Sequence, residues 1–148
     1  MKGTSKKTIV ISWVAVVAWA CLIFAASAHT GDNLNNAEDL LGIIKKWLDG
    51  VLAQWNIPGM QESSSLGHFT EYTIFGILLT NAFRHHLPFP QAILAAIACA
   101  SFYGVTDEIH QIFVPGRACD PADWVVDTLG ATLGSGLFFA GLKRFRKK

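Results

Sequence analysis

The sequence predicts an all-α membrane protein: a bundle of four transmembrane helices, with an additional amphipathic interfacial helix in the first external loop. Hydrophobic residues make up 51% of the 148-residue chain and charged residues 16%, and the mean hydropathy is +0.35. Four apolar segments each approach the ~20 residues that cross a ~30 Å hydrocarbon core. The length corresponds to a single domain over residues 1–148. A formal net charge of +1 indicates no nucleic-acid partner.

The four predicted spans cover about residues 8–28, 66–83, 91–112 and 121–142. A soluble helical bundle would explain the second and third segments, but not the first, which carries no charge. The lysines before residue 8 and the Ala26-Ser27-Ala28 sequence also resemble a cleavable signal peptide. The apolar run is longer than the ~7–15 residues of such a peptide. Trp13 and Trp19 are typical of a retained helix that packs on its neighbours, so retention is favoured.

A further helix is predicted over about residues 37–55. Its leucines, isoleucines, Trp47 and Trp55 recur at spacings of three and four, which places them on one face. Such a face suits a helix lying in the membrane interface. Docking on the outer end of the bundle explains the same pattern, and the sequence does not separate the two.

Lysine and arginine predict the orientation. With four spans, nine basic residues fall on the side of the termini and three on the other side: Lys45, Lys46 and Arg117. Cytoplasmic loops carry the excess of basic residues in membrane proteins. Both termini are therefore expected to be cytoplasmic, and the loop that contains Arg117 external.

Polar side chains of the last three spans are expected at one depth near the external surface. A rise of 1.5 Å per residue places the acids within about 9 Å of the outer helix ends. Residues three and four apart share a helix face. The second span contributes His68, Glu71 and Tyr72, the third Asp107, Glu108, His110 and Gln111, and the fourth Asp123 and Asp127.

Membrane-embedded acids must face the bundle interior or a water-filled cavity and need partners. Arg117 follows Pro115-Gly116, which can turn its guanidinium back over the acids. The candidate catalytic residues are Glu71, Asp107, His110 and Arg117. The candidate substrate-binding residues are His68, Tyr72, Glu108, Gln111, Asp123 and Asp127. An ion-paired network that only holds the helices together is the competing interpretation.

No cofactor is predicted, and the sequence identifies no metal ligands. The acids could jointly bind a divalent cation, Mg²⁺ or Ca²⁺ through oxygen ligands or Zn²⁺ if the histidines take part. No HExxH or comparable metal motif is present. The glycines Gly130 and Gly134 form a GxxxG pattern that lets a neighbouring helix approach closely, and Gly76 could act in the same way. Asp120 before Pro121 predicts a helix N-cap.

These motifs resemble the VanZ-like family of bacterial membrane proteins. HFTEY at residues 68–72, DEIHQIFVPGR at 107–117, Asp123 and the following DTLGATLG carry the likeness, which covers about residues 10–140. Asp127 stands where the family pattern favours asparagine. The resemblance implies a multi-pass protein of the bacterial cytoplasmic membrane, in a family whose founding members are associated with resistance to the glycopeptide teicoplanin.

Three functions remain open at this stage. The first is an enzyme or binder that acts on an envelope lipid or glycan precursor. In it Glu71 or Asp107 is the general acid or base, Arg117 holds an anionic group and His110 relays protons. A small proton-coupled transporter is the second, although only Thr73, Ser101 and Thr132 offer polar groups near the midplane. A non-catalytic accessory protein is the third. Whether the chain is an enzyme, which envelope lipid or glycopeptide ligand it takes, and its oligomeric state are not determined by the sequence.

Overall fold

The chain forms an all-helical bundle. The computed structural model describes residues 4–28, 63–115, 117 and 119–146, and these ranges contain four helices and no strand. The helices are α1 (Lys6–Ser27), α4 (Ser63–Phe83), α5 (Phe89–Gln111) and α6 (Pro121–Arg146). Each predicted span therefore corresponds to a helix, with ends within a few residues of the prediction. The predicted amphipathic helix over 37–55 lies outside the described residues.

Three of the four helices are long and apolar enough to cross a membrane: Lys6–Ser27, Phe89–Gln111 and Pro121–Arg144. The remaining helix, α4, packs against each of the other three helices and most extensively against α6. Its polar side chains can therefore meet partners from all of them.

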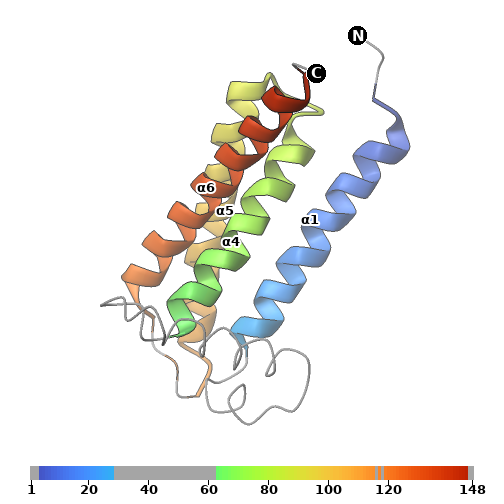
Figure 1. Cartoon of the computed structure of the whole chain (residues 1–148). Helices are drawn as coiled ribbons and strands as arrows, with labels where there is room; N and C mark the ends of the chain where they lie inside the picture. Colours follow the sequence, from blue (N-terminus) through green and yellow to red (C-terminus); the bar gives the residue numbers. More distant parts are fainter. Residues whose placement is uncertain (1–3, 29–62, 116, 118, 147–148) are drawn as a thin grey trace.

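The helices run up and down, so the connections alternate between the two ends of the bundle. Figure 1 shows the start of α1, the end of α6 and the turn between α4 and α5 at one end. The end of α1, the start of α4 and the connection from α5 to α6 lie at the opposite end. The sequence stretch rich in acids therefore sits at the end away from both termini.

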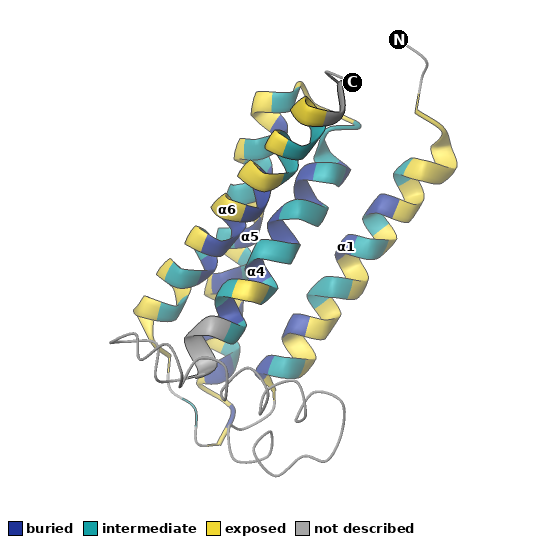
Figure 2. Ribbon diagram, viewed as in Figure 1, coloured by how far each residue is buried: buried dark blue, intermediate teal, exposed yellow. Residues whose placement is uncertain are grey.

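The outer faces of the bundle are apolar. Large hydrophobic side chains that are exposed lie along α1, α5 and α6, among them Ile11, Val14, Leu94, Phe102 and Leu129. Figure 2 shows these exposed stretches on the outside of the helices and the buried residues facing inward. A soluble protein rarely exposes so many contiguous apolar side chains, whereas a lipid environment accommodates them.

The core combines large side chains of α4 with small ones of its neighbours. Tyr72, Phe75 and Leu79 of α4 are buried against Ala96 and Ala100 of α5. Trp13 and Trp19 of α1 pack against this cluster, as expected for a packed first helix. The Trp19 indole N–H also donates to the Glu71 carbonyl at 3.0 Å, and the Tyr103 hydroxyl donates to the Ala20 carbonyl at 2.6 Å. These two hydrogen bonds dock α1 on the other helices.

Glycines bring α4 and α6 into backbone contact, which confirms the prediction made from the GxxxG pattern. A Cβ added at Gly130 would lie 2.6 Å from the Phe69 carbonyl oxygen. One at Gly134 would overlap the Thr73 carbonyl oxygen, and one at Gly76 the carbonyl oxygen of Ala131. Three positions on two helices therefore exclude any side chain larger than hydrogen.

The end of the bundle near the termini is closed by polar contacts between α1 and the turn after α4. His85 Nε2 lies 3.3 Å from the Ser12 hydroxyl, which also accepts a hydrogen bond from Asn81 at 3.1 Å. The Trp13 indole N–H donates to His86 Nε2 at 3.0 Å. Burial and the neighbouring charge of Arg84 lower the pKa of His85, which favours the neutral imidazole. These histidines hold the first helix rather than standing free in solvent.

The glycine contact yields a direct test. Gly134→Ala is expected to destabilise the protein by about 1–3 kcal/mol, because the added methyl group overlaps backbone that cannot move aside. Gly136→Ala, two residues along the same helix, meets nothing within 4 Å and is expected to be neutral or slightly stabilising. Melting temperatures of the two variants in detergent would measure the difference. Equal melting temperatures would show that the helices do not approach closely at Gly134.

Candidate functional site

The site lies where α5 ends and α6 begins. The Asp120 side chain accepts a hydrogen bond from the backbone N–H of Ala122 at 2.8 Å, so Asp120 caps α6 and Pro121 takes the first helical position, as predicted. The backbone N–H of Asp120 in turn donates to Glu108 Oε2 at 2.8 Å. Glu108, near the end of α5, thereby fixes where α6 starts.

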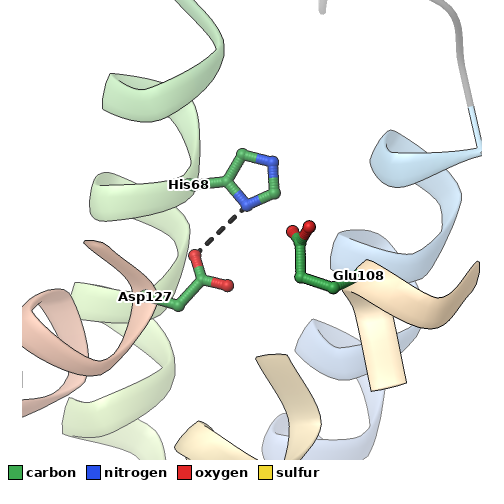
Figure 3. Close-up of side chains that lie close together, drawn as sticks. All are labelled: His68, Glu108 and Asp127. Carbon is green, nitrogen blue, oxygen red and sulfur yellow. Dashed lines mark hydrogen bonds and ion pairs between the residues drawn. The ribbon is translucent and has the colours of Figure 1, made fainter. Parts of the chain in front are cut away.

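His68 of α4 lies between acids of the two neighbouring helices. Its Nδ1 is 3.2 Å from Oδ1 of Asp127 on α6 and 4.0 Å from Oδ2 of Asp107 on α5. Figure 3 shows the Asp127 and Glu108 carboxylates directed toward the imidazole from two sides. Three helices therefore meet around one imidazole ring.

Gln111 completes this contact on the side of α5. Its amide nitrogen lies 3.4 Å from Nε2 of His68 and 3.5 Å from Oδ2 of Asp107, one helical turn before it. The Gln111 side chain is almost fully buried. It holds the imidazole ring and the Asp107 carboxylate in fixed relative positions.

The acids of this cluster are buried and only partly satisfied. Asp127 is 0% exposed, Asp107 2% and Glu108 4%. One oxygen of each carboxylate has no hydrogen-bond partner: Oδ2 of Asp127, Oδ1 of Asp107 and Oε1 of Glu108. An unsatisfied buried carboxylate oxygen is costly, so the arrangement has unused capacity to bind a proton, a cation or a ligand.

Further predicted residues surround this centre. Glu71 interacts electrostatically with His68, Asp107, Asp127 and Arg117. Asp123, in the first turn of α6, interacts in the same way with His68, Glu108 and Asp127. The predicted group of acids, histidine and arginine is therefore one cluster in space. The catalytic or binding role of each member stays a prediction.

Two predicted residues lie at the edge of the cluster. The His110 ring stacks on Phe24 of α1, with ring centroids 4.2 Å apart, so it faces the first helix rather than His68. Tyr72 is fully buried, and its hydroxyl has no hydrogen-bond partner. The hydroxyl still interacts electrostatically with Asp127, Asp107 and Glu71.

One subset has the arrangement of a metal site. His68, Glu108 and Asp127 each offer a ligand atom, and these atoms lie within 4.8 Å of one another. The three residues come from three different helices (Figure 3). No local spacing in the sequence singles them out, because no two of them lie on the same helix.

Sequence reasoning missed a second buried polar pair in the bundle. The Thr80 hydroxyl donates to the Ser135 hydroxyl at 2.9 Å, and Ser135 lies 3.4 Å from the Gly76 carbonyl oxygen. Ser135 directly follows Gly134, so its place on the glycine face of α6 was the available signal. This pair joins α4 to α6 deeper in the bundle than the acids.

The fold and the site together define a small multi-helical membrane protein with a buried acid and imidazole centre at the end away from its termini. The family model described as VanZ/LLP1 matches residues 12–144, so the chain belongs to this family. The match covers most of α1, all of α4 and α5, nearly all of α6, and every candidate site residue. Searches of curated proteins and of solved structures found no match.

Two tyrosines make a matched pair for testing the site. Tyr72→Phe removes a hydroxyl without a partner, so it is expected to leave stability unchanged or raise it by about 1 kcal/mol. Tyr103→Phe removes the donor to the Ala20 carbonyl and is expected to lower stability by about 1 kcal/mol. Melting curves of both variants provide the measurement. A clear loss of stability in Tyr72→Phe would show that its hydroxyl has a structural partner.

Proposed function

We propose that this VanZ-family protein is an integral membrane protein of the bacterial cell envelope that binds an envelope lipid or glycan precursor and contributes to resistance to glycopeptides such as teicoplanin. The observation that supports it most directly is the buried cluster of His68, Asp107 and Asp127, with carboxylate oxygens that no hydrogen bond satisfies. Buried carboxylates without partners destabilise a helix bundle, so a purely structural role does not explain why the cluster contains so many acids.

The proposed orientation places four spans in the cytoplasmic membrane with both termini in the cytoplasm. Lys6, Lys7, Arg84, Lys143 and Arg144 belong to the end of the bundle that holds the start of α1 and the end of α6. The positive-inside tendency assigns that end to the cytoplasm. The acid cluster then lies at the end of the bundle in the outer leaflet, where envelope precursors are used.

The proposed roles follow the chemistry of each side chain. Arg117 would hold an anionic group of the ligand, since a guanidinium binds phosphate or carboxylate through two hydrogen bonds. Glu71 and Asp107 would act as general base or acid if the protein is catalytic. His110 interacts electrostatically with Asp107 and would move protons between the cluster and the side of α1.

An accessory role without catalysis is the second candidate, and specific contacts favour it. His68 links α4 to α6, and Glu108 fixes the start of α6 through the Asp120 N–H. Removing either side chain would loosen the bundle. In this alternative the cluster determines only how the helices assemble, and another surface binds the drug or a partner.

A transporter receives less support from the contacts in the bundle. The hydroxyls of Thr73 and Thr132 bond to carbonyls of their own helices, at 2.7 Å each. The Ser101 hydroxyl is occupied by Trp124 and Thr128. Each of the three groups considered for a midplane path is therefore already engaged in a structural contact.

A neighbouring pair of variants separates function from stability. Asp107→Asn is expected to abolish the rise in teicoplanin tolerance that the wild-type protein gives a susceptible host, while its melting temperature stays within a few degrees of wild type. Thr106→Ala is the control, because Thr106 is exposed and bonds only the Tyr103 carbonyl of its own helix. Susceptibility and melting curves are measured on the same three proteins. Full tolerance in Asp107→Asn would contradict the proposed site.

Cys119 tests the orientation. It is exposed in the connection between α5 and α6, and it is a free thiol. In a background with Cys21→Ser and Cys99→Ser, a membrane-impermeant maleimide is expected to label Cys119 in intact spheroplasts. If Cys119 is labelled only after the membrane is broken, the acid cluster lies on the cytoplasmic side and the proposed orientation is wrong.

A further inference from the structure

We infer that His68, Glu108 and Asp127 form a binding site for one divalent transition-metal ion of the Zn²⁺ type. Their ligand atoms lie within 4.8 Å of one another, from three helices, inside the bundle. The inference does not depend on which envelope molecule the protein takes. Each of the following observations supports it separately.

The first observation is the set of donor atoms. An imidazole nitrogen with two carboxylate oxygens is the mixed set that Zn²⁺ and similar ions accept, whereas Mg²⁺ and Ca²⁺ prefer oxygen alone. Ligand bonds to zinc are about 2.0–2.2 Å long and the geometry is tetrahedral, so two ligand atoms on one ion are about 3.4 Å apart. The ligand atoms here lie within 4.8 Å of one another, so the widest separation has to shorten by about 1–1.5 Å when an ion binds.

The second observation is that the cluster has unused acceptor atoms. Asp127 Oδ2 and Glu108 Oε1 have no hydrogen-bond partner, although both residues are more than nine-tenths buried. Figure 3 shows the two carboxylates pointing toward the same imidazole ring. Their other oxygens lie 3.2 Å from His68 Nδ1 and 2.8 Å from the Asp120 backbone nitrogen, and an ion bound to Nδ1 would take the place of the hydrogen bond between His68 and Asp127. The free oxygens are the atoms that an ion would take.

The third observation is the support around the ligands. His68 presents Nδ1 to Asp127, while its Nε2 faces the Gln111 amide at 3.4 Å. Histidine ligands normally have their second ring nitrogen fixed in this way, and the oxygen and nitrogen ends of an amide are interchangeable by rotation. Gly104 leaves room beside Asp127, since a Cβ there would lie 3.0 Å from Oδ2. Gln111 is thus a positioning residue for the site.

An ion at this place would resolve a conflict within the proposed function. Closely spaced carboxylates repel an anionic headgroup, so an acidic site for an envelope precursor needs added positive charge. A divalent ion held by three protein ligands keeps coordination positions open for oxygen atoms of a ligand. Arg117, which interacts electrostatically with Glu71, would stand near the same group.

The test is metal binding by the full-length protein in detergent, with its affinity tag removed. Cys21, Cys99 and Cys119 are exposed free thiols and are changed to serine, so that they cannot bind zinc. Elemental analysis after dialysis against Zn²⁺ is expected to give one ion per chain. Added Zn²⁺ is expected to raise the melting temperature, because an ion that binds only the folded state stabilises it. Mg²⁺ and Ca²⁺ at the same concentration are expected to have much smaller effects.

Isosteric variants assign the ligands. Glu108→Gln and Asp127→Asn keep the size and one acceptor of each side chain. Mutating a residue that only hydrogen-bonds a metal ligand typically lowers metal affinity about 10–100-fold, so each of these ligand variants is expected to lower Zn²⁺ affinity by at least that factor. Thr106→Ala is the control and is expected to bind Zn²⁺ as wild type does, since Thr106 is outside the three ligands and its hydroxyl bonds the Tyr103 carbonyl of its own helix. Circular dichroism verifies that each variant is folded.

Three results would overturn the inference. These are wild-type protein without stoichiometric zinc, equal binding by Asp127→Asn and wild type, and an equal response to Mg²⁺. A Co²⁺ spectrum of the wild-type protein provides a measurement that needs no variant. Visible absorption stronger than that of hexahydrated Co²⁺ would indicate a low-symmetry site with nitrogen and oxygen ligands and would support the inference. A spectrum equal to that of hexahydrated Co²⁺ would contradict it.

Discussion

The close contact between α4 and α6 is the constraint on which the rest of the structure depends. Gly130 and Gly134 let the α6 backbone touch that of α4. Because apolar side chains gain little by leaving lipid for another helix, such backbone proximity and interhelical hydrogen bonds supply much of the association in membranes. Asp127 lies one turn before Gly130, so the same contact presses its carboxylate against His68. Packing and site geometry are therefore set by one interface.

The bundle separates its polar contacts by depth. At the end near the termini, histidines of the turn after α4 bind Ser12 and Trp13 of α1. In the interior, the Thr80 and Ser135 hydroxyls bind each other. In both sets each donor has an acceptor, so these polar groups cost the fold little. The acid cluster is different in kind, because Asp107, Glu108 and Asp127 each keep one buried carboxylate oxygen without a hydrogen-bond partner. That imbalance is the physical reason for regarding it as a site.

Several features were predictable because they depend on neighbouring residues. The helix positions follow from four apolar segments, and the cap at Asp120 follows from the proline after it. The GxxxG pattern predicted the close helix contact, and helical spacing placed His68 with Tyr72 and Asp107 with Gln111 on common faces. The resemblance of the motifs to the VanZ-like family was confirmed by the family match over residues 12–144. The helix predicted over 37–55 remains a prediction.

The sequence by itself determined which residues are helical, which of them are polar, and that the polar ones fall near one end. It did so because helix periodicity and hydrophobic length are properties of local sequence. Only the tertiary structure decided which polar residues meet: His68 with Asp127 and Glu108, while His110 turns to Phe24. Rotation of each helix about its own axis is fixed by contacts with the other helices, and this information is not present in any one segment. The packing of α4 against each of the other three helices was decided in the same way.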